Sequence, residues 1–451
     1  MSDDAAPDGL PLPRRWWAMA AIWLAMVMAV LDSAIANVAL PTIARDLGAS
    51  AADAIWVVNA YQIAIVMLLL TVASLGEILG YRRVYAAGLV LFVAASVVCT
   101  LAGSLTGLAL ARFAQGFGAA AIMGINGALV RFAWPRAQLG RGIGANALVV
   151  AIASAAGPSV AAAVLALGSW RWLFAINVPF GLASLAIGWA ALPTPPVADR
   201  RFDWRSALLA AIAFAALFAV AETLAHGGVS LATGVALLVA AGAGWPLIRI
   251  ARRESDPLIP LDLIGVPLLR LSYAASVASF AAMMIGLVAL PFYLQARWGF
   301  DHVEAGLAIT ALPLGVAVAA PIAGRLVERV AAGLLGAVGL ALLACGYGVV
   351  AVLTPGAGTA ALVAAIASCG MGFGLFQTPN NRTMMGAAPA RRSGAAAGML
   401  ATSRLVGQTL GAVGVAAVFR MGDTRSVIPF LIAAVLAVVA AVLSARRLGA
   451  A

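Results

Sequence analysis

The residues that could do chemistry in this sequence are few, and the first is an aspartate inside an apolar segment. Asp32 stands in "LDSAIANVAL" (31–40), the end of an apolar run that begins at Trp16. A charged side chain at the centre of a membrane segment costs at least ~2.5–3.5 kcal/mol. A carboxylate in such a place can bind and release a proton, or attract a cation. The alternative is a static pair with a basic residue, for which Arg112 is the candidate.

The composition indicates which elements position these residues. Of 451 residues, 64% are hydrophobic and 10% are charged, which is too little charge for a soluble protein of this length. The apolar runs lack the alternation of β-barrel strands, and helices satisfy their backbone groups within lipid. The first run is long and no cleavage site follows it, so it predicts a spanning helix and not a signal peptide. We therefore predict an all-α, multi-pass membrane protein.

Fourteen apolar runs approach the ~20 residues that a helix needs to cross a bilayer. They lie at 16–40, 55–77, 84–103, 108–130, 140–167, 172–192, 206–224, 231–250, 268–295, 303–322, 333–353, 358–381, 394–418 and 427–444.

The arginines give these helices a direction. With the N-terminus inside and alternating crossings, 21 arginines fall on inner segments and 5 on outer loops, while Arg112 and Arg404 lie within helices. This asymmetry follows the positive-inside rule. It predicts an even number of helices and two cytoplasmic termini, and it explains the net charge of +11 by a membrane and not by nucleic acid.

Two polar, proline-containing inner loops, 193–205 and 251–267, divide the chain and predict a 6+2+6 arrangement. The predicted parts are an N-terminal six-helix half, two extra linker helices with their flanking loops, and a C-terminal six-helix half, at 1–192, 193–267 and 268–451. A Leu-x-Glu sequence follows the second helix of each half, with Glu77 and Glu328 as its acids. Such repetition is expected of two parallel halves of a transporter.

With these motifs the chain resembles the fourteen-helix drug:proton antiporter branch of the major facilitator superfamily over nearly its whole length. "LDSAIANVALP" (31–41) is similar to the first-helix motif of that branch, L-D-x-T-I-V-N-V-A-L-P. "RFAQGFGAA" (112–120) is similar to its fourth-helix motif, R-x-x-Q-G-x-G-A-A. Trp56 and Tyr61 match its second-helix segment.

The resemblance implies a role for Asp32 and Arg112. By residue count they lie about 12 Å and about 6 Å below the outer ends of their helices, and in the implied fold both helices face one cavity. We predict that Asp32 carries the exchanged proton and that Arg112 takes part in coupling. The alternatives are a static pair and, for Arg112, bonds to carbonyls of the 16–40 helix. Gln115, Gly116 and Gly118 permit close helix approach beside it.

Two further motifs are kept only in part. The inner-loop motif, G-x-L-A-D-R-x-G-R-R in the family, keeps an acid and arginines as Glu77, Arg82 and Arg83. With Glu328 of the second half, we predict a gate that bridges helix ends; ordinary positive-inside charge is the alternative for the arginines.

The fifth-helix antiporter motif, G-P-x-x-G-G in the family, keeps Gly157 and Pro158 but has Ala161 and Ala162 in place of the glycine pair. Gly157 and Pro158 could kink the helix and shape the cavity. The departure leaves the direction of transport open.

Other polar side chains in apolar helices could line a substrate cavity, and each could instead form an interhelical hydrogen bond. Arg404 has no evident carboxylate partner in the last three helices. Two interpretations stay open: Arg404 occupies a position shared with the family, or it binds an anionic substrate. With Asp32, the predicted cavity set is Tyr61, Gln62, Tyr293, Gln295, Gln377, Asn380 and Asn381.

We expect proton-driven export of lipophilic, in part cationic, drugs or dyes by a monomer in the bacterial inner membrane, working by alternating access with no cofactor. The alternative is proton-coupled transport of one specific metabolite. An enzyme would need Ser, His, Asp or metal-ligand groups at a shared depth, and the sequence has no such set. A channel would more often show pore-lining repeats and symmetric assembly. Three cysteines, Cys99, Cys345 and Cys369, lack the spacing of a metal site or a disulfide framework.

Overall fold

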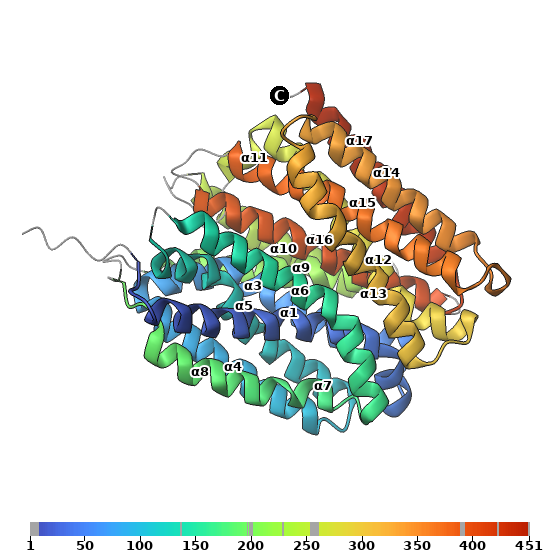
Figure 1. The fold of residues 1–451 in the computed structure, drawn as a ribbon, viewed down its shortest axis with the longest axis horizontal. Helices are drawn as coiled ribbons and strands as arrows, with labels where there is room; N and C mark the ends of the chain where they lie inside the picture. Colours follow the sequence, from blue (N-terminus) through green and yellow to red (C-terminus); the bar gives the residue numbers. More distant parts are fainter. Residues whose placement is uncertain are drawn as a thin grey trace, which may run out of the picture.

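The structure is a computed structural model that describes residues 9–449 except 136–137, 196, 198–201, 228–229, 253–260, 388–392 and 422–423. The described residues contain helices and no strand, and the long helices lie side by side (Figure 1). Parts of the predicted inner loops 193–205 and 251–267 fall outside the described residues.

The helices follow one another in three groups. The first group is α1 (Arg14–Asp46), α2 (Ala51–Ala54), α3 (Trp56–Leu79), α4 (Tyr81–Leu101), α5 (Leu105–Ala133), α6 (Leu139–Leu167), α7 (Trp172–Ala175) and α8 (Asn177–Ala191). The second is α9 (Trp204–Gly227) and α10 (Leu231–Ala251). The third is α11 (Leu261–Ile264), α12 (Pro267–Trp298), α13 (His302–Leu326), α14 (Ala332–Val352), α15 (Thr359–Gly386), α16 (Ser393–Met421) and α17 (Ile428–Arg446), and the 3₁₀ turn η4 (Arg447–Gly449) ends it.

Helix length and hydropathy indicate how many of these helices can cross a membrane. Among the described residues, 11 helices are long and apolar enough to cross a membrane, and α6 makes up to 12 as a span bent by 40°. The bend follows Ser154, whose carbonyl cannot accept the usual helical bond because Pro158 has no N–H. The all-helical, multi-pass fold is confirmed, whereas the count of fourteen spans and the cytoplasmic termini stay predictions.

The same packing scheme recurs in the first and third groups. In the first, α1 packs on α6 and α8, and α5 packs on α3 and α4. In the third, α12 packs on α16 and α17, and α15 packs on α13 and α14. The groups meet where α6 packs on α13 and α3 on α16. The two groups are called below the first and second half, and the predicted domain bounds stay a prediction.

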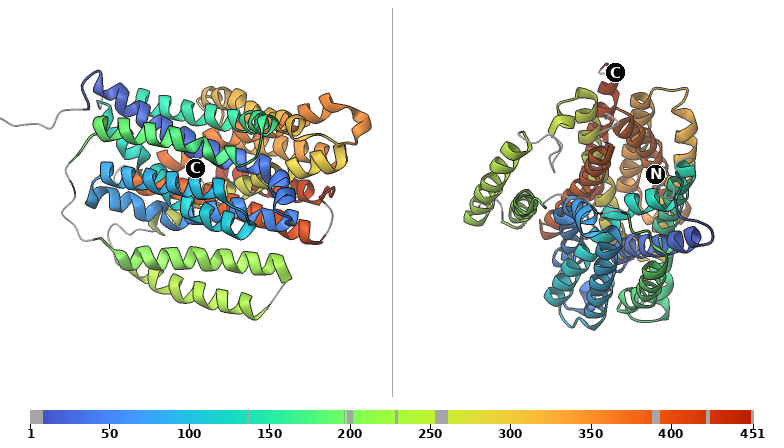
Figure 2. Two further views of the ribbon diagram at one scale, coloured as in Figure 1. Left: turned by 90° about the horizontal axis from the view of Figure 1, so that it is seen from below. Right: turned by 90° about the vertical axis from the view of Figure 1, so that its left-hand side faces the viewer.

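The helices α9 and α10 lie on one flank. Figure 2 shows this pair, in green, beside the other helices, and α9 packs on α3 and α16. The linker role of this pair stays a prediction.

Glycines on α5 and α6 allow the helices to approach closely near Asp32. A Cβ at Gly116 would lie 2.4 Å from the Tyr61 carbonyl oxygen, and one at Gly118 would lie 2.6 Å from that of Gly88. A Cβ at Gly157 would lie 2.5 Å from the Cβ of Ala34. Such close contacts bring α3 and α4 against α5, and α6 against α1, at the depth of the predicted site.

Candidate functional site

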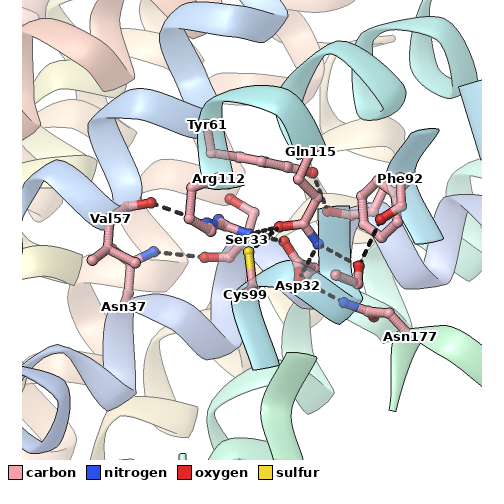
Figure 3. A network of polar contacts seen from close by, with 12 residues as sticks. Asp32, Ser33, Asn37, Val57, Tyr61, Phe92, Cys99, Arg112, Gln115 and Asn177 are labelled. Atoms are coloured by element: carbon pink, nitrogen blue, oxygen red, sulfur yellow. Dashed lines mark hydrogen bonds and ion pairs between the residues drawn. The ribbon is translucent and has the colours of Figure 1, made fainter. Parts of the chain in front are cut away.

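Asp32 is fully buried, and its carboxylate receives three side-chain donors. One oxygen, Oδ2, forms an ion pair with Nη1 of Arg112. The other, Oδ1, accepts from Nε2 of Gln115 at 3.0 Å and from Nδ2 of Asn177 at 2.7 Å. Figure 3 shows these side chains converging on the carboxylate. The structure thus joins the two charged residues that the sequence separates by 80 positions.

Arg112 is also fully buried, and it ties three helices together. Its Nε donates to the Val57 carbonyl at 3.0 Å, and Nη1 donates to Oε1 of Gln115 at 2.7 Å. The guanidinium carbon lies 4.1 Å from the centre of the Tyr61 ring, a cation–π distance. Arg112 therefore holds α3 and α1 against α5.

The local sequence explains how α5 presents both donors. Arg112 and Gln115 are three positions apart on one helix, so they lie on the same face. Nε2 of Gln115 also donates to Oγ of Ser96 on α4 at 2.9 Å. The orientation of the Gln115 amide is thereby fixed by two helices, α1 and α4.

Asn177 is a residue of the cluster that the sequence analysis did not identify. It is the first residue of α8, and it is buried with 3% of its surface exposed. The available signal was an amide near the start of the apolar run 172–192. Its contact with Asp32 arises from the packing of α8 against α1, which the sequence alone does not show.

The arrangement suits an ionised Asp32. All three groups on the carboxylate present donors, and a buried charge is tolerated when its partners satisfy it. A proton on Asp32 would weaken the ion pair and would need a neighbour to turn an acceptor toward it. Gain or loss of one proton would therefore change how α1, α5 and α8 are tied together.

The predicted gating residues lie where two helices almost meet. Glu77 is in the last turn of α3, Arg82 and Arg83 are in the first turn of α4, and only Gly80, with φ +93°, lies between the helices. The expected loop is therefore a single residue, since glycine tolerates this backbone conformation. The Arg82 guanidinium lies 4.6 Å from the centre of the Trp189 ring on α8.

Glu77 and Arg83 are exposed, as is Glu328 in the turn between α13 and α14. The assignment of these residues to a gate stays a prediction.

We expect Glu77→Gln, or Arg82→Ala combined with Arg83→Ala, to lower transport at an unchanged protein level. These groups would bridge helix ends in only one of the two conformations, so their loss would shift the population between them. Transport is compared at equal expression with Arg252→Ala, which removes an exposed arginine at the end of α10. Wild-type rates in the Glu77 and Arg82/Arg83 variants would rule out the gate.

The predicted cavity residues do not gather around one space in this conformation. Tyr61 belongs to the Asp32 cluster, and its hydroxyl donates to the Ala29 carbonyl at 3.1 Å. Nε2 of Gln62 contacts Sδ of Met284 in the second half at 3.8 Å.

The remaining members of the set lie elsewhere in the second half. The Tyr293 hydroxyl donates to the Val350 carbonyl at 3.3 Å, and Gln295 accepts from Nη2 of Arg45 at 3.4 Å. Asn380 is buried, and its Oδ1 accepts from Nη1 of Arg447 at 2.6 Å. Gln377 and Asn381 are half-buried. A cavity role for any of them stays a prediction.

The fifth-helix motif lies between the halves. The carbonyl of Pro158 would be 3.1 Å from a Cβ at Gly306 of α13, and Cβ of Ala162 would be 2.8 Å from it. The hydroxyls of Ser159 and Thr310 are 2.9 Å apart in a hydrogen bond. Ala162, one of the two departures from the family motif, thus forms part of this tight interface.

The predicted outer end of the molecule is closed by contacts between the halves. Nη2 of Arg420 on α16 lies 2.8 Å from Oδ1 of Asp53 on α2, and Arg45 bonds Gln295 as described. A single apolar cluster beneath them contains side chains of α1, α3, α12 and α16. Asp32 is therefore covered from this end of the molecule.

Comparison with known proteins agrees with the fold. Residues 22–412 and 271–449 match the Major Facilitator Superfamily. The chain is 48% identical to the "Uncharacterized transporter YebQ" of Escherichia coli (strain K12) over 98% of this chain and 97% of that one. It is 32% identical to the "Multidrug resistance protein Stp" of Mycobacterium tuberculosis (strain CDC 1551 / Oshkosh) over 86% of this chain and 73% of that one.

Among solved structures, a peptide transporter POT in complex with sulfate has a similar fold, with a TM-score of 0.72 at 14% identity over 96% of this chain and 94% of that one. This likeness concerns the fold, whereas the family model and the relative at 48% identity identify the family. The chain is a multi-pass membrane transporter that belongs to the Major Facilitator Superfamily.

Proposed function

We propose that the protein exports lipophilic small molecules across the bacterial inner membrane in exchange for protons. The observation that carries this proposal is the buried Asp32 carboxylate, held by Arg112, Gln115 and Asn177 in the membrane interior. An ionisable group at such a place in a transporter is suited to a proton relay. The relation to a protein named for multidrug resistance supports export of drug-like molecules.

In this mechanism the structure corresponds to the state that is closed outside, with Asp32 ionised. Binding of a proton to Asp32 weakens its hold on Arg112 and on the two amides, which loosens α1 from α5 and α8. The first half then moves against the second, where α6 meets α13 and α3 meets α16. The proton and the substrate act by favouring different conformations of this pair of halves.

The sequence predicts that cations are among the substrates, because Asp32 could attract them. In this conformation Arg112 already matches the charge of Asp32. Attraction of a cation would therefore require Arg112 to move away from the carboxylate during the cycle. Transport of cations by this protein thus depends on such a movement of Arg112.

Membrane vesicles turned inside out test the exchange directly. We expect a proton gradient, acidic inside, to drive dye into vesicles that contain the protein, and added dye to release protons from them. An uncoupler should stop both fluxes because one cycle links them. Dye uptake that persists after the gradient is collapsed would contradict antiport. A panel of unrelated dyes and drugs distinguishes broad export from transport of one metabolite, which would leave all but one compound unmoved.

A further inference from the structure

Arg404 lies deep within the membrane-spanning part of the second half. It stands on α16 (Ser393–Met421), about 17 Å from one end of the helix and about 25 Å from the other at 1.5 Å per residue. An unpaired charge at this depth costs at least ~2.5–3.5 kcal/mol. Its retention there calls for a compensating group.

Neighbouring residues of α16 define the direction of Arg404. Oγ of Ser403 donates to Oγ of Ser276 at 3.2 Å, so that side of the helix faces α12. Leu405 belongs to an apolar cluster formed mainly by the first half. Arg404 lies between these two directions, because successive helical residues turn by about 100°.

The opposite side of α16 faces the flank. Leu410 is 46% exposed there, and with Thr409 it lines a cavity of about 140 Å³ between α3, α9 and α16. Gln408 follows Arg404 by one turn and shares its face. Arg404 and Gln408 are both half-buried, and they point toward the region where α16 faces α12 and the first half, not toward the flank.

The Arg404 guanidinium has no partner among the described residues. Its Nε is buried without a hydrogen bond, and the described part of the chain offers it no ion pair. The sequence from 268 to 451 contains four acidic residues, and the three that the structure describes, Asp301, Glu304 and Glu328, lie near the ends of helices. In the first half, the acid at membrane depth, Asp32, is already paired with Arg112.

The buried Arg447 shows which contacts an arginine with a structural role makes in this protein. Arg447 is 2% exposed, and it donates to Oδ1 of Asn380, to Oγ of Ser272 at 3.3 Å and to Ser444. Those bonds tie the end of α17 to α12 and α15. Arg404 has no such set, so helix packing does not explain it.

We propose that Arg404 recognises an anionic group of the substrate, such as a carboxylate or a phenolate. A guanidinium binds a planar oxyanion through two parallel hydrogen bonds, and Gln408 adds a donor on the same face. Because Asp32 and Arg112 neutralise each other, Arg404 leaves the interior with a net positive charge. This inference rests on the proposed export function and specifies its substrate class.

Two dyes of one skeleton test the inference by direct binding. Fluorescein is an anion and rhodamine 123 is a cation on the same xanthene ring system. Their binding to the purified protein in lipid nanodiscs is followed by fluorescence polarisation, without any gradient. We expect Arg404→Gln to weaken fluorescein binding by at least about tenfold, as for loss of hydrogen bonds to a charged group. Rhodamine 123 binding should be unchanged or tighter.

Arg404→Lys keeps the charge, so it should retain part of the fluorescein affinity. Arg270→Gln removes the same charge from an exposed position on α12 and should leave both affinities unchanged. Equal fluorescein binding by wild type and Arg404→Gln would overturn the inference, as would equal loss of both dyes, which indicates a structural role. Fluorescein binding that depends on Arg404 without any proton-linked transport would instead count against the proposed antiport alone.

Discussion

Asp32→Asn is expected to abolish proton-driven export while the protein still folds. Asparagine has the same shape and can accept from Gln115 and Asn177, but it neither binds nor releases a proton. Every substrate should be affected alike, since the loss concerns the coupling step and not recognition. The measurement is dye and proton flux in inverted vesicles at matched protein level, with export falling at least about a hundredfold, in the range of removing one essential proton-transfer group.

Asp46→Asn provides a matched control on the same helix. Asp46 ends α1, is 46% exposed in its side chain, and pairs with Arg171 at 2.9 Å. Its replacement should leave export near the wild-type rate, because exposed ion pairs contribute little. Full coupled export by Asp32→Asn would reduce Asp32 to a structural partner of Arg112 and end the proposed mechanism.

Arg112→Gln is expected to destabilise the protein clearly, because it breaks the same buried ion pair from the other side. It leaves the Asp32 carboxylate buried without its cation, and breaking one side of a buried pair costs about 3–5 kcal/mol. The cation–π contact with Tyr61 and the bond to the Val57 carbonyl are lost with it. Thermal unfolding in detergent should show a clearly lowered midpoint.

The double variant with Arg112→Gln and Asp32→Asn separates folding from coupling. Removing both charges leaves neutral amides that can bond to each other, so most of the lost stability should return. Export should not return, because no proton carrier remains. A double variant that is as unstable as Arg112→Gln alone would contradict the assigned ion pair, and one that exports with proton coupling would contradict the role of Asp32.

The sequence by itself determined the membrane class, the helical segments and the central pair. Apolar runs of bilayer length must form helices, because lipid offers no partner to the backbone. Each predicted run from 16–40 to 427–444 accordingly overlaps a long helix or the α7–α8 pair. The approach of Asp32 and Arg112 was expected because the family resemblance places both of their helices at one cavity, and the structure shows the ion pair.

Only the tertiary structure decided which other side chains join them. Asn177 belongs to the site, and Tyr61 covers Arg112, whereas Asn380 is bound to Arg447 at another end of the molecule. A polar residue in an apolar run has a known depth but an unknown partner. Its direction depends on how each helix is rotated and crossed against its neighbours, and close contacts such as that of Gly116 with Tyr61 set that rotation. Those contacts join residues far apart in the chain, so no local pattern of the sequence contains them.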